Sequence, residues 1–337
     1  MIDPSTSNRT GPTDTGRETT TRQRYAAIDI GTNSVKIWVA DCGGDGFPET
    51  VHEEIEITKL GQDLGETGSL TDDAITRTLD TARRFVHLAR DLDVQLLTIA
   101  ATSAVRKARN QETFLSRARE ELQQDVQVIS GEREAELTFA GVTHGRGHEA
   151  DEISVFDVGG GSTEFIHGDL AGDIHQKSVP VGSVQLYERL GWNGPLSDAE
   201  LETGTERTRN VIREHISNED LASYARSAQL IGVGGTIATI AQVHLGLTEF
   251  SKSEIEGCRI SRSDIMKTSE EIFRHSPQER VDQLHVKPGR SEYIAGGAAV
   301  VNGVLDVLSA SELQATCRGL RHGLLIDAFR SKESDQQ

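Results

Sequence analysis

Short apolar runs rich in β-branched residues occur at several points of the chain, and the first two lie close together. Residues 25–30 (YAAIDI) and 34–40 (SVKIWVA) are separated by Gly31, Thr32 and Asn33. Gly and Asn between two such runs are typical of the tight turn of a β-hairpin. The sequence therefore predicts two antiparallel strands joined by a short polar turn.

The same pattern returns in the second half of the chain. Residues 153–158 (ISVFDV) and 162–168 (STEFIHG) flank three consecutive glycines at 159–161. The two turns share the pattern Asp-x-Gly-x-x-Ser, at 29–34 and at 157–162, each at the end of a predicted strand. We interpret this as an internal duplication of a loop, and not as a short solenoid repeat.

Between and after the hairpins, apolar positions near the 3.6-residue spacing of an amphipathic helix alternate with further short apolar runs. Strands are predicted at 96–101, 126–129 and 229–232, and helices at 72–91 and from Thr236, Ser291 and Arg318, with two more helices between 101 and 126. Strands that alternate with helices indicate an α/β fold. Together with the duplicated hairpin, they predict two related lobes with a cleft between them.

Composition adds the expected boundaries. Residues 1–23 are rich in Thr, Ser, Gly and Pro and have almost no bulky apolar side chains, so we expect a disordered tail there. We expect a first lobe over 24–145, a second lobe over 146–330 and a short tail over 331–337. No run reaches the roughly 18 to 20 apolar residues of a membrane helix, and the N-terminus lacks the apolar stretch of a signal peptide. We therefore expect a cytoplasmic protein that does not bind membranes.

Acidic residues outnumber basic ones by 53 to 35, which gives a formal net charge of −18. A chain this acidic repels nucleic-acid phosphates, so we expect no general nucleic-acid binding. A polyanionic substrate would have to be held by local basic groups and metal ions.

The Asp-x-Gly-x-x-Ser turns have the residue types of an anion site. Glycine lets the backbone approach a ligand, successive N–H groups can point at an anion, and the hydroxyl adds a donor. The aspartate suits a metal ion instead, because Mg²⁺ is usually held by one or two carboxylates plus substrate phosphates. A hairpin turn whose aspartate only accepts N–H bonds is the alternative. A third glycine-rich turn, GVGGTI at 232–237, follows a strand and opens a helix, which favours an anion or a simple packing turn.

Seven segments carry a resemblance to a known family, and they cover residues 24–330. They are AAIDIGTNSVKIWVA, ATSAVRKARNQETFL, VISGEREAELTFAGV, VFDVGGGSTEF, VGSVQLYERLG, GVGGTIATIA and LRHGLLIDAF. In this order and spacing they resemble the exopolyphosphatase and guanosine pentaphosphate phosphohydrolase (Ppx/GppA) family. The resemblance implies two actin-like, ribonuclease H-like lobes, as in actin, sugar kinases and heat-shock ATPases. It also implies that the last helix, 318–330, returns to the first lobe.

The resemblance further implies Mg²⁺-dependent hydrolysis of the terminal phosphate of inorganic polyphosphate, or of the 5′-terminal phosphate of guanosine pentaphosphate. The sequence leaves a monovalent cation activator and a homodimer open. The glutamate of the family that acts as the base for the attacking water corresponds to Glu134, and the glutamate that commonly precedes it is replaced by Arg133. The implied metal carboxylates are Asp29, Asp157 and Glu164. The phosphate-binding residues would be Gly31, Thr32, Asn33, Ser34, Arg106, Gly159, Gly160, Gly161, Ser162, Gly234 and Gly235.

Each implied role has a plainer alternative from the residues alone. Glu134 could be a solvated glutamate on a charged helix face, and Arg106 could pair with nearby acids at an exposed helix start. For the whole protein, exopolyphosphatase is the leading prediction and guanosine pentaphosphate hydrolase the alternative. A non-hydrolytic phosphate or nucleotide sensor is a further alternative, although pure binding needs no base. An actin-like or sugar-kinase user of ATP is less favoured, because Glu134 follows the phosphatase pattern. The chain resembles the short, two-lobe form of the family.

Overall fold

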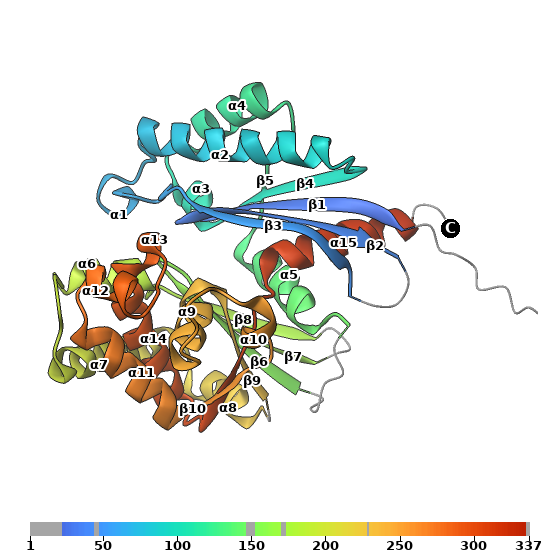
Figure 1. Ribbon diagram of the computed structural model, residues 1–337. Helices are drawn as coiled ribbons and strands as arrows, with labels where there is room; N and C mark the ends of the chain where they lie inside the picture. The colour runs from blue at the N-terminus through green and yellow to red at the C-terminus, as the bar shows by residue number, and fades with distance from the viewer. Residues whose placement is uncertain (1–21, 44–46, 146–151, 170–172, 228, 335–337) are drawn as a thin grey trace, which may run out of the picture.

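The computed structural model describes residues 22–43, 47–145, 152–169, 173–227 and 229–334. The predicted tail over 1–23 lies almost entirely outside the described residues. The described residues form two α/β lobes, one above the other in Figure 1, and each lobe has its own mixed sheet.

The sheet of the first lobe has the order β3-β2-β1-β4-β5. Its strands are β1 (Gln23–Ile30), β2 (Ser34–Cys42), β3 (Glu49–Ile57), β4 (Leu96–Ala101) and β5 (Gln127–Val128). β1, β2 and β3 pair antiparallel, whereas β4 runs parallel to β1 and β5 parallel to β4. The predicted first hairpin is therefore confirmed as β1 and β2.

The sheet of the second lobe has the order β10-β11-β9-β6-β7-β8. Its strands are β6 (Glu152–Val158), β7 (Thr163–Asp169), β8 (Ile174–Val179), β9 (Gln229–Val233), β10 (Arg259–Ser261) and β11 (Glu312–Ala315). From β8 to β11 the order and the strand directions repeat those of the first sheet, and β10 adds an antiparallel edge. The expectation of two related lobes with this duplicated α/β topology is confirmed.

Helices cover the outer face of the first sheet. The helices before the second sheet are α1 (Leu64–Thr67), α2 (Asp72–Asp91), α3 (Ser103–Lys107), α4 (Gln111–Leu122) and α5 (Gly131–Thr143). In α2 the Thr71 hydroxyl accepts a hydrogen bond from the Ala74 N–H, and the apolar stripe predicted from the sequence is buried. N-cap hydroxyls and one buried stripe are what define such a helix.

The remaining helices follow in the second half of the chain, and all but the last, α15, belong to the second lobe. They are α6 (Ser183–Arg189), α7 (Asp198–His215), α8 (Asn218–Arg226), α9 (Gly234–His244), α10 (Lys252–Ile255), α11 (Arg262–Arg274), α12 (Pro277–Asp282), α13 (Pro288–Ser291), α14 (Ile294–Val307) and α15 (Leu320–Ser334). α14 is apolar on almost all sides and is enclosed by α6, α7, α9 and α11. A helix with no polar face must be buried, and α14 forms the centre of the second core.

Two helices, α5 and α15, form a layer between the two sheets (Figure 1). α15 packs against β1, β2 and β4 of the first sheet. α5 precedes the second lobe in the chain, yet its side chains Ala135, Phe139 and Val142 pack against the second sheet. The lobes are thus joined by exchanged helices as well as by the chain connection.

The crossing of α5 and α15 requires glycine. A Cβ at Gly323 would lie 1.7 Å from the carbonyl oxygen of Leu137, and one at Gly141 would lie 2.4 Å from that of Gly319. Real Cβ atoms do not approach backbone atoms this closely, so the two backbones touch only because both helices carry glycine there.

Three helix boundaries differ from the sequence predictions. α9 includes Gly234 and Gly235, which were expected in the turn before it. The helix expected from Ser291 starts at Ile294, whereas Ser291 ends α13 and its carbonyl accepts a hydrogen bond from the buried Arg280 guanidinium. The helix expected over 318–330 runs from Leu320 to Ser334, so part of the predicted C-terminal tail is helical. Its end is held against β1, where Phe329 and Lys332 contact the Tyr25 ring.

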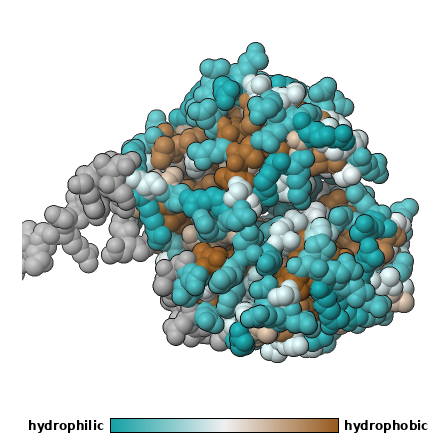
Figure 2. Space-filling view, turned by 180° about the vertical axis from the view of Figure 1, so that it is seen from behind, coloured by the Kyte–Doolittle hydropathy of each residue, from teal (hydrophilic) through white to brown (hydrophobic). Residues whose placement is uncertain are grey.

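The rear face of the molecule is mostly hydrophilic, and its hydrophobic residues lie in separate patches (Figure 2). Among the described residues, none of the helices is both long enough and apolar enough to cross a bilayer.

Candidate active site

The two Asp-x-Gly-x-x-Ser turns have the same closed geometry. The Gly31 N–H donates to the Ser34 carbonyl at 3.0 Å, and the Gly159 N–H donates to the Ser162 carbonyl at 2.9 Å. Each turn directly follows the first strand of its hairpin, which is β1 in the first lobe and β6 in the second. The duplication seen in the sequence is therefore a duplication of backbone conformation.

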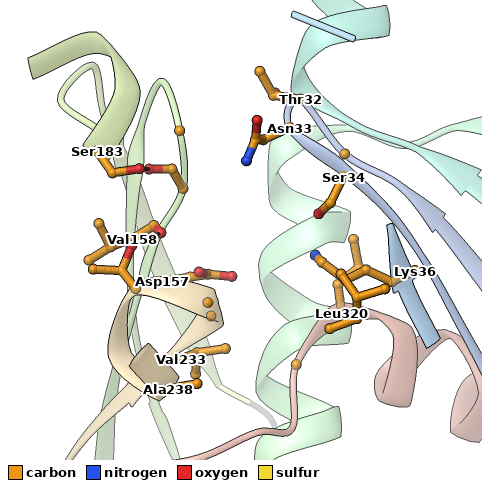
Figure 3. A pocket seen from close by; sticks show the side chains of 18 of the residues that line it. Thr32, Asn33, Ser34, Lys36, Asp157, Val158, Ser183, Val233, Ala238 and Leu320 are labelled. Atoms are coloured by element: carbon orange, nitrogen blue, oxygen red, sulfur yellow. Dashed lines mark hydrogen bonds between the residues drawn. The ribbon is translucent and has the colours of Figure 1, made fainter. Parts of the chain in front are cut away.

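The two turns face each other across a cleft between the lobes. A Cβ at Gly160 would lie only 3.9 Å from the Cβ of Asn33. Figure 3 shows Thr32, Asn33, Ser34 and Lys36 on one wall and Asp157 on the other. The predicted residues that line the cleft are Asp29, Gly31, Thr32, Asn33, Ser34, Glu134, Asp157, Gly159, Gly160, Gly161, Ser162, Glu164, Gly234 and Gly235.

The third glycine-rich turn packs directly against the second. Gly234 has a φ of +91°, and a Cβ there would lie 2.3 Å from Oδ1 of Asp157. A Cβ at Gly235 would lie 1.5 Å from Nη1 of Arg290. Only glycine fits both positions, because one must adopt positive φ beside a carboxylate and the other leaves room for a guanidinium.

In the first lobe the aspartate of the turn is neutralised. Asp29 on β1 is directly opposite Lys36 on β2, and the Lys36 ammonium lies 2.7 Å from Oδ2 of the nearly fully buried Asp29. Sequence reasoning missed Lys36, although the predicted hairpin register already places it opposite Asp29. Asp29 was predicted to hold a metal ion; in the structure its Oδ2 is paired with Lys36, and the metal role stays a prediction.

In the second lobe the corresponding positions are both acidic. Asp157 on β6 is directly opposite Glu164 on β7. Oε1 of Glu164 accepts hydrogen bonds from Ser162 at 2.6 Å and from Ser178 at 3.0 Å. Burial raises the pKa of both carboxyls above their ordinary values, with further increases from Asp29 at Asp157 and from Asp157 at Glu164. This side of the cleft therefore places two buried carboxyl groups opposite each other, where the first lobe has an ion pair.

Glu134 reaches the cleft from the first turn of α5, which begins where the Ser130 hydroxyl accepts a hydrogen bond from the backbone of Arg133. Its side chain is 19% exposed. Burial first, and then nearby Glu164, raise the pKa of Glu134 to about 8, although Arg106 acts to lower it. A carboxylate with a raised pKa is a stronger base, which suits proton abstraction near neutral pH.

Arg106, on α3, was predicted to bind phosphate and is not among the residues that line the cleft. Its Nη1 donates to the Ile129 carbonyl at 2.7 Å and to Oε2 of Glu134 at 3.1 Å. Arg106 thus contacts the predicted base directly through Nη1, and its role in phosphate binding stays a prediction.

Further cations line the cleft that no local pattern in the sequence indicated. They are Lys287 just before α13, Arg290 on α13 and Arg321 on α15. Burial lowers the pKa of Arg290, and Arg321 lowers it further. Since these residues come from distant parts of the chain, only the fold brings their charges to one place.

The carboxylates of the second lobe fit a divalent cation in chemistry. Asp157 and Glu164 offer the hard oxygen donors that Mg²⁺ prefers, and Mg²⁺ needs only one or two carboxylates when substrate phosphates and water complete its shell. Within the described residues no group of three or more His, Cys, Asp or Glu side chains is arranged to hold a metal ion. The three-carboxylate site with Asp29 as its third member stays a prediction.

A family model described as the Ppx/GppA phosphatase family matches residues 39–332. The chain belongs to the Ppx/GppA phosphatase family. The resemblance noted in the sequence is thus confirmed.

Curated relatives of this Ppx/GppA protein include enzymes of more than one name. Exopolyphosphatase 2 of Mycobacterium tuberculosis is 30% identical over 82% of this chain and 88% of its own length. A guanosine-5′-triphosphate,3′-diphosphate pyrophosphatase of Photobacterium profundum is 25% identical over 90% of this chain and 59% of its own length. A bifunctional 3-dehydroquinate synthase/phosphatase of Fusobacterium nucleatum is 28% identical, and the match spans 47% of that protein.

Solved structures agree with the fold. An exopolyphosphatase from Cytophaga hutchinsonii has a TM-score of 0.82 at 26% identity, covering 92% of this chain and 98% of that one. The Ppx/GppA family member from Aquifex aeolicus has a TM-score of 0.77 at 27% identity, covering 92% and 99%. The relatives carry the names of phosphatases and pyrophosphatases, so the comparisons give the sensor alternative no support. The chain is a member of a hydrolase family.

Proposed function

We propose that this protein is an exopolyphosphatase, which removes the terminal phosphate from inorganic polyphosphate. The observation that supports this proposal most directly is that Glu134 shares one cleft with two facing glycine turns. A base on one wall and phosphate-binding N–H groups on both walls are the parts that hydrolysis of a phosphoanhydride needs.

In the proposed reaction the oxygen of a water attacks the terminal phosphorus in line with the anhydride bond. The bond from that phosphorus to the bridging oxygen breaks, and inorganic phosphate and a chain one unit shorter leave. Glu134 takes the proton of the attacking water. With a pKa of about 8, about a tenth of Glu134 is ionised at pH 7, and cations that enter the cleft increase that fraction.

The rest of the proposed catalysis is electrostatic stabilisation of the transition state. The charge of phosphoryl transfer spreads over equatorial oxygens, which backbone N–H groups of the two turns and the cations Lys36, Arg290 and Arg321 can stabilise. Asp157 and Glu164 would hold Mg²⁺, which when bound offsets phosphate charge. Arg106 orients the Glu134 carboxylate through the hydrogen bond that its Nη1 donates to Oε2.

Guanosine pentaphosphate is the second candidate substrate, and a specific observation favours it. The same cleft is lined by Ile55, Ile57 and Phe250, and the Phe250 ring is 43% exposed. Lys287 lies over that ring, with its Nζ 5.3 Å from the ring centroid. Inorganic polyphosphate has no apolar part to contact these side chains, whereas a nucleobase stacks on aromatic rings.

The experiment is Mg²⁺-dependent phosphate release from polyphosphates of defined length and from guanosine pentaphosphate, measured side by side. Glu134→Gln should lower kcat by about 10² to 10⁴-fold, because the general base is lost. The matched control is Glu136→Gln on the same helix, where the carboxylate is half-exposed and pairs with Arg133 at 2.9 Å. This variant should keep the wild-type rate.

Each result distinguishes the candidates. Release from polyphosphate that Glu134→Gln abolishes supports the exopolyphosphatase and its base together. Release from the nucleotide alone would transfer the activity to the second candidate. Full activity of a folded Glu134→Gln protein would show that the base is assigned wrongly.

A further inference from the structure

A single carboxylate joins two cations at the edge of the cleft. Glu53 on β3 accepts from the Lys252 ammonium through Oε2 at 2.7 Å, and from Nη2 of Arg321 through Oε1. The Glu53 side chain is 18% exposed and that of Arg321 is 9% exposed. Arg321 and Lys252 hold the pKa of Glu53 below its ordinary value against the effect of burial, so the carboxylate is ionised at neutral pH.

The three partners come from three elements that lie far apart in the sequence. Glu53 belongs to the edge strand of the first sheet, and Arg321 to α15, which packs on that sheet. Lys252 begins α10, which packs against α9 of the second lobe. The Glu53–Lys252 pair therefore crosses between the lobes, whereas the Glu53–Arg321 pair stays on the first-lobe side.

Arg321 also lines the cleft, next to Gly319 and Leu320. Its Nη2 additionally donates to the Cys317 carbonyl at 3.3 Å. Its Nε is buried, and within the described residues it has no hydrogen-bond partner. Within the part of the chain that the structure describes, Glu53 is thus the carboxylate that holds this guanidinium at the cleft.

Other contacts show that β3 and the residues after it are where the first lobe meets the second. A Cβ at Gly289 of α13 would lie 2.9 Å from Cγ1 of Ile57. Beyond the strand, Lys59 lies 3.9 Å from Glu292 and over the Tyr293 ring. A residue of β3 that holds a cation on each side is therefore placed to control how the lobes sit across the cleft.

The energetics of ion pairs favour the view that Glu53 fixes the positions of its partners more than it adds stability. Partly buried ion pairs add little net stability, because desolvation offsets the Coulomb attraction, but they fix one arrangement of the groups they join. We propose that Glu53 is a positioning residue: it holds Arg321 in place at the cleft and, through Lys252, couples that cation to the position of the second lobe. This inference rests on the proposed hydrolase function, since lobe closure assembles the two walls around the phosphate.

The test compares Glu53→Gln, Lys252→Met and the double variant by steady-state phosphate release. Each single change should lower kcat about 10-fold with little change in KM, because the aligned arrangement is less populated while the cleft loses no ligand of the phosphate. If the two residues act as one unit, the double variant loses no more than either single variant. Losses that multiply in the double variant, or a Lys252→Met protein with wild-type kcat, would overturn the proposal.

The matched control is Asp41→Asn. Asp41 lies on β2, next to β3, is 26% exposed and pairs with Arg24 at 2.7 Å, all within the first lobe. It should lower the thermal midpoint about as much as Glu53→Gln and leave kcat unchanged. An equal loss of kcat in Asp41→Asn would reduce Glu53 to a structural ion pair.

A second readout separates this inference from the proposed function. Small-angle X-ray scattering of the substrate-free proteins should show a larger radius of gyration for Glu53→Gln and Lys252→Met than for wild type and Asp41→Asn. A wild-type protein inactive on both substrates would overturn the proposed function, and scattering would then decide the coupling alone. Identical scattering of all four proteins would contradict it.

Discussion

The two walls of the cleft are built on the same hairpin and differ in charge at one cross-strand position. In the first lobe Asp29 is opposite Lys36, and in the second lobe Asp157 is opposite Glu164. The turn geometry is the same in both lobes. The same backbone thus carries an ion pair at this position in one wall and two facing carboxyl groups in the other, where we propose that a cation binds.

This difference determines the environment of Glu134, which lies between the walls. Glu164 of the acidic hairpin raises the pKa of Glu134 more than Asp29 does, in keeping with the Lys36 pair that offsets Asp29. The acidic wall therefore does two things in our interpretation: it attracts a divalent cation and it keeps the general base strong. The predictions below alter the charge on one wall at a time.

The largest effect is expected from giving the second hairpin the charge pattern of the first. Glu164→Lys would place an ammonium opposite Asp157 where the cation is expected. We expect phosphate release to fall by about 10³-fold or more, about 4 kcal/mol of activation free energy. The measurement is kcat at saturating Mg²⁺, together with Mg²⁺ titration by calorimetry.

Glu164→Gln provides the milder comparison, since it removes the charge and keeps the shape. It should bind Mg²⁺ weakly, whereas Glu164→Lys should not bind it at all. Mg²⁺-dependent activity at the wild-type level in Glu164→Lys would disprove the assignment of the metal to this wall.

The next effect concerns stability and pH. The pKa of Glu134 is about 8 in the folded protein and about 4.5 in the unfolded chain, so the folded state binds the proton more tightly. This contribution to stability is present below pH 4.5 and is lost as pH rises through 8. The glutamine of Glu134→Gln does not titrate. In urea unfolding with EDTA present, the free energy of unfolding of wild type should therefore fall by about 3 kcal/mol relative to that of Glu134→Gln between pH 5.5 and pH 9. Parallel curves for the two proteins would contradict the raised pKa.

A smaller loss is expected from Lys36→Met on the neutral wall. It leaves Asp29 buried without its cation, and breaking such a pair is destabilising even where the pair itself adds little. Because Lys36 is partly exposed, we expect about 2 kcal/mol less stability at pH 7, measured by urea unfolding. Unlike the Glu164 variants, the folded Lys36→Met protein should keep its affinity for Mg²⁺. A loss of Mg²⁺ affinity equal to that of Glu164→Gln would remove the distinction between the walls.

Much of this arrangement could be predicted from the sequence, because the signals for it are local. The duplicated turn, the hairpins and the alternation of strands and helices depend on neighbouring residues. Lys36 could have been found in the same way, since a hairpin that turns at Gly31 to Ser34 pairs it with Asp29.

The rest depends on contacts between distant segments. Arg290, Arg321 and Glu53 reach the cleft or its edge only because α13, α15 and β3 meet there. The periodicity of α5 shows a buried face and does not show that this face packs on the second sheet. The contact between Arg106 and Glu134 is of the same kind, because the sequence neighbours of Arg106 do not reveal that the Glu134 carboxylate lies 3.1 Å from its guanidinium.

The smallest expected effect is a change in Mg²⁺ affinity when one serine hydroxyl is removed from either turn. Ser162 and Ser34 occupy the same position of the two turns, but only Ser162 donates to a carboxylate, Oε1 of Glu164 at 2.6 Å. A partner that orients a metal-binding carboxylate typically changes metal affinity by about 10-fold, so Ser162→Ala should weaken Mg²⁺ binding by about 1 kcal/mol. Ser34→Ala should leave Mg²⁺ affinity in the absence of substrate unchanged, because its hairpin carries Lys36 in place of Glu164. Calorimetric titration of both variants decides the point, and an equal weakening in both would mean that the two turns contribute to the metal site alike.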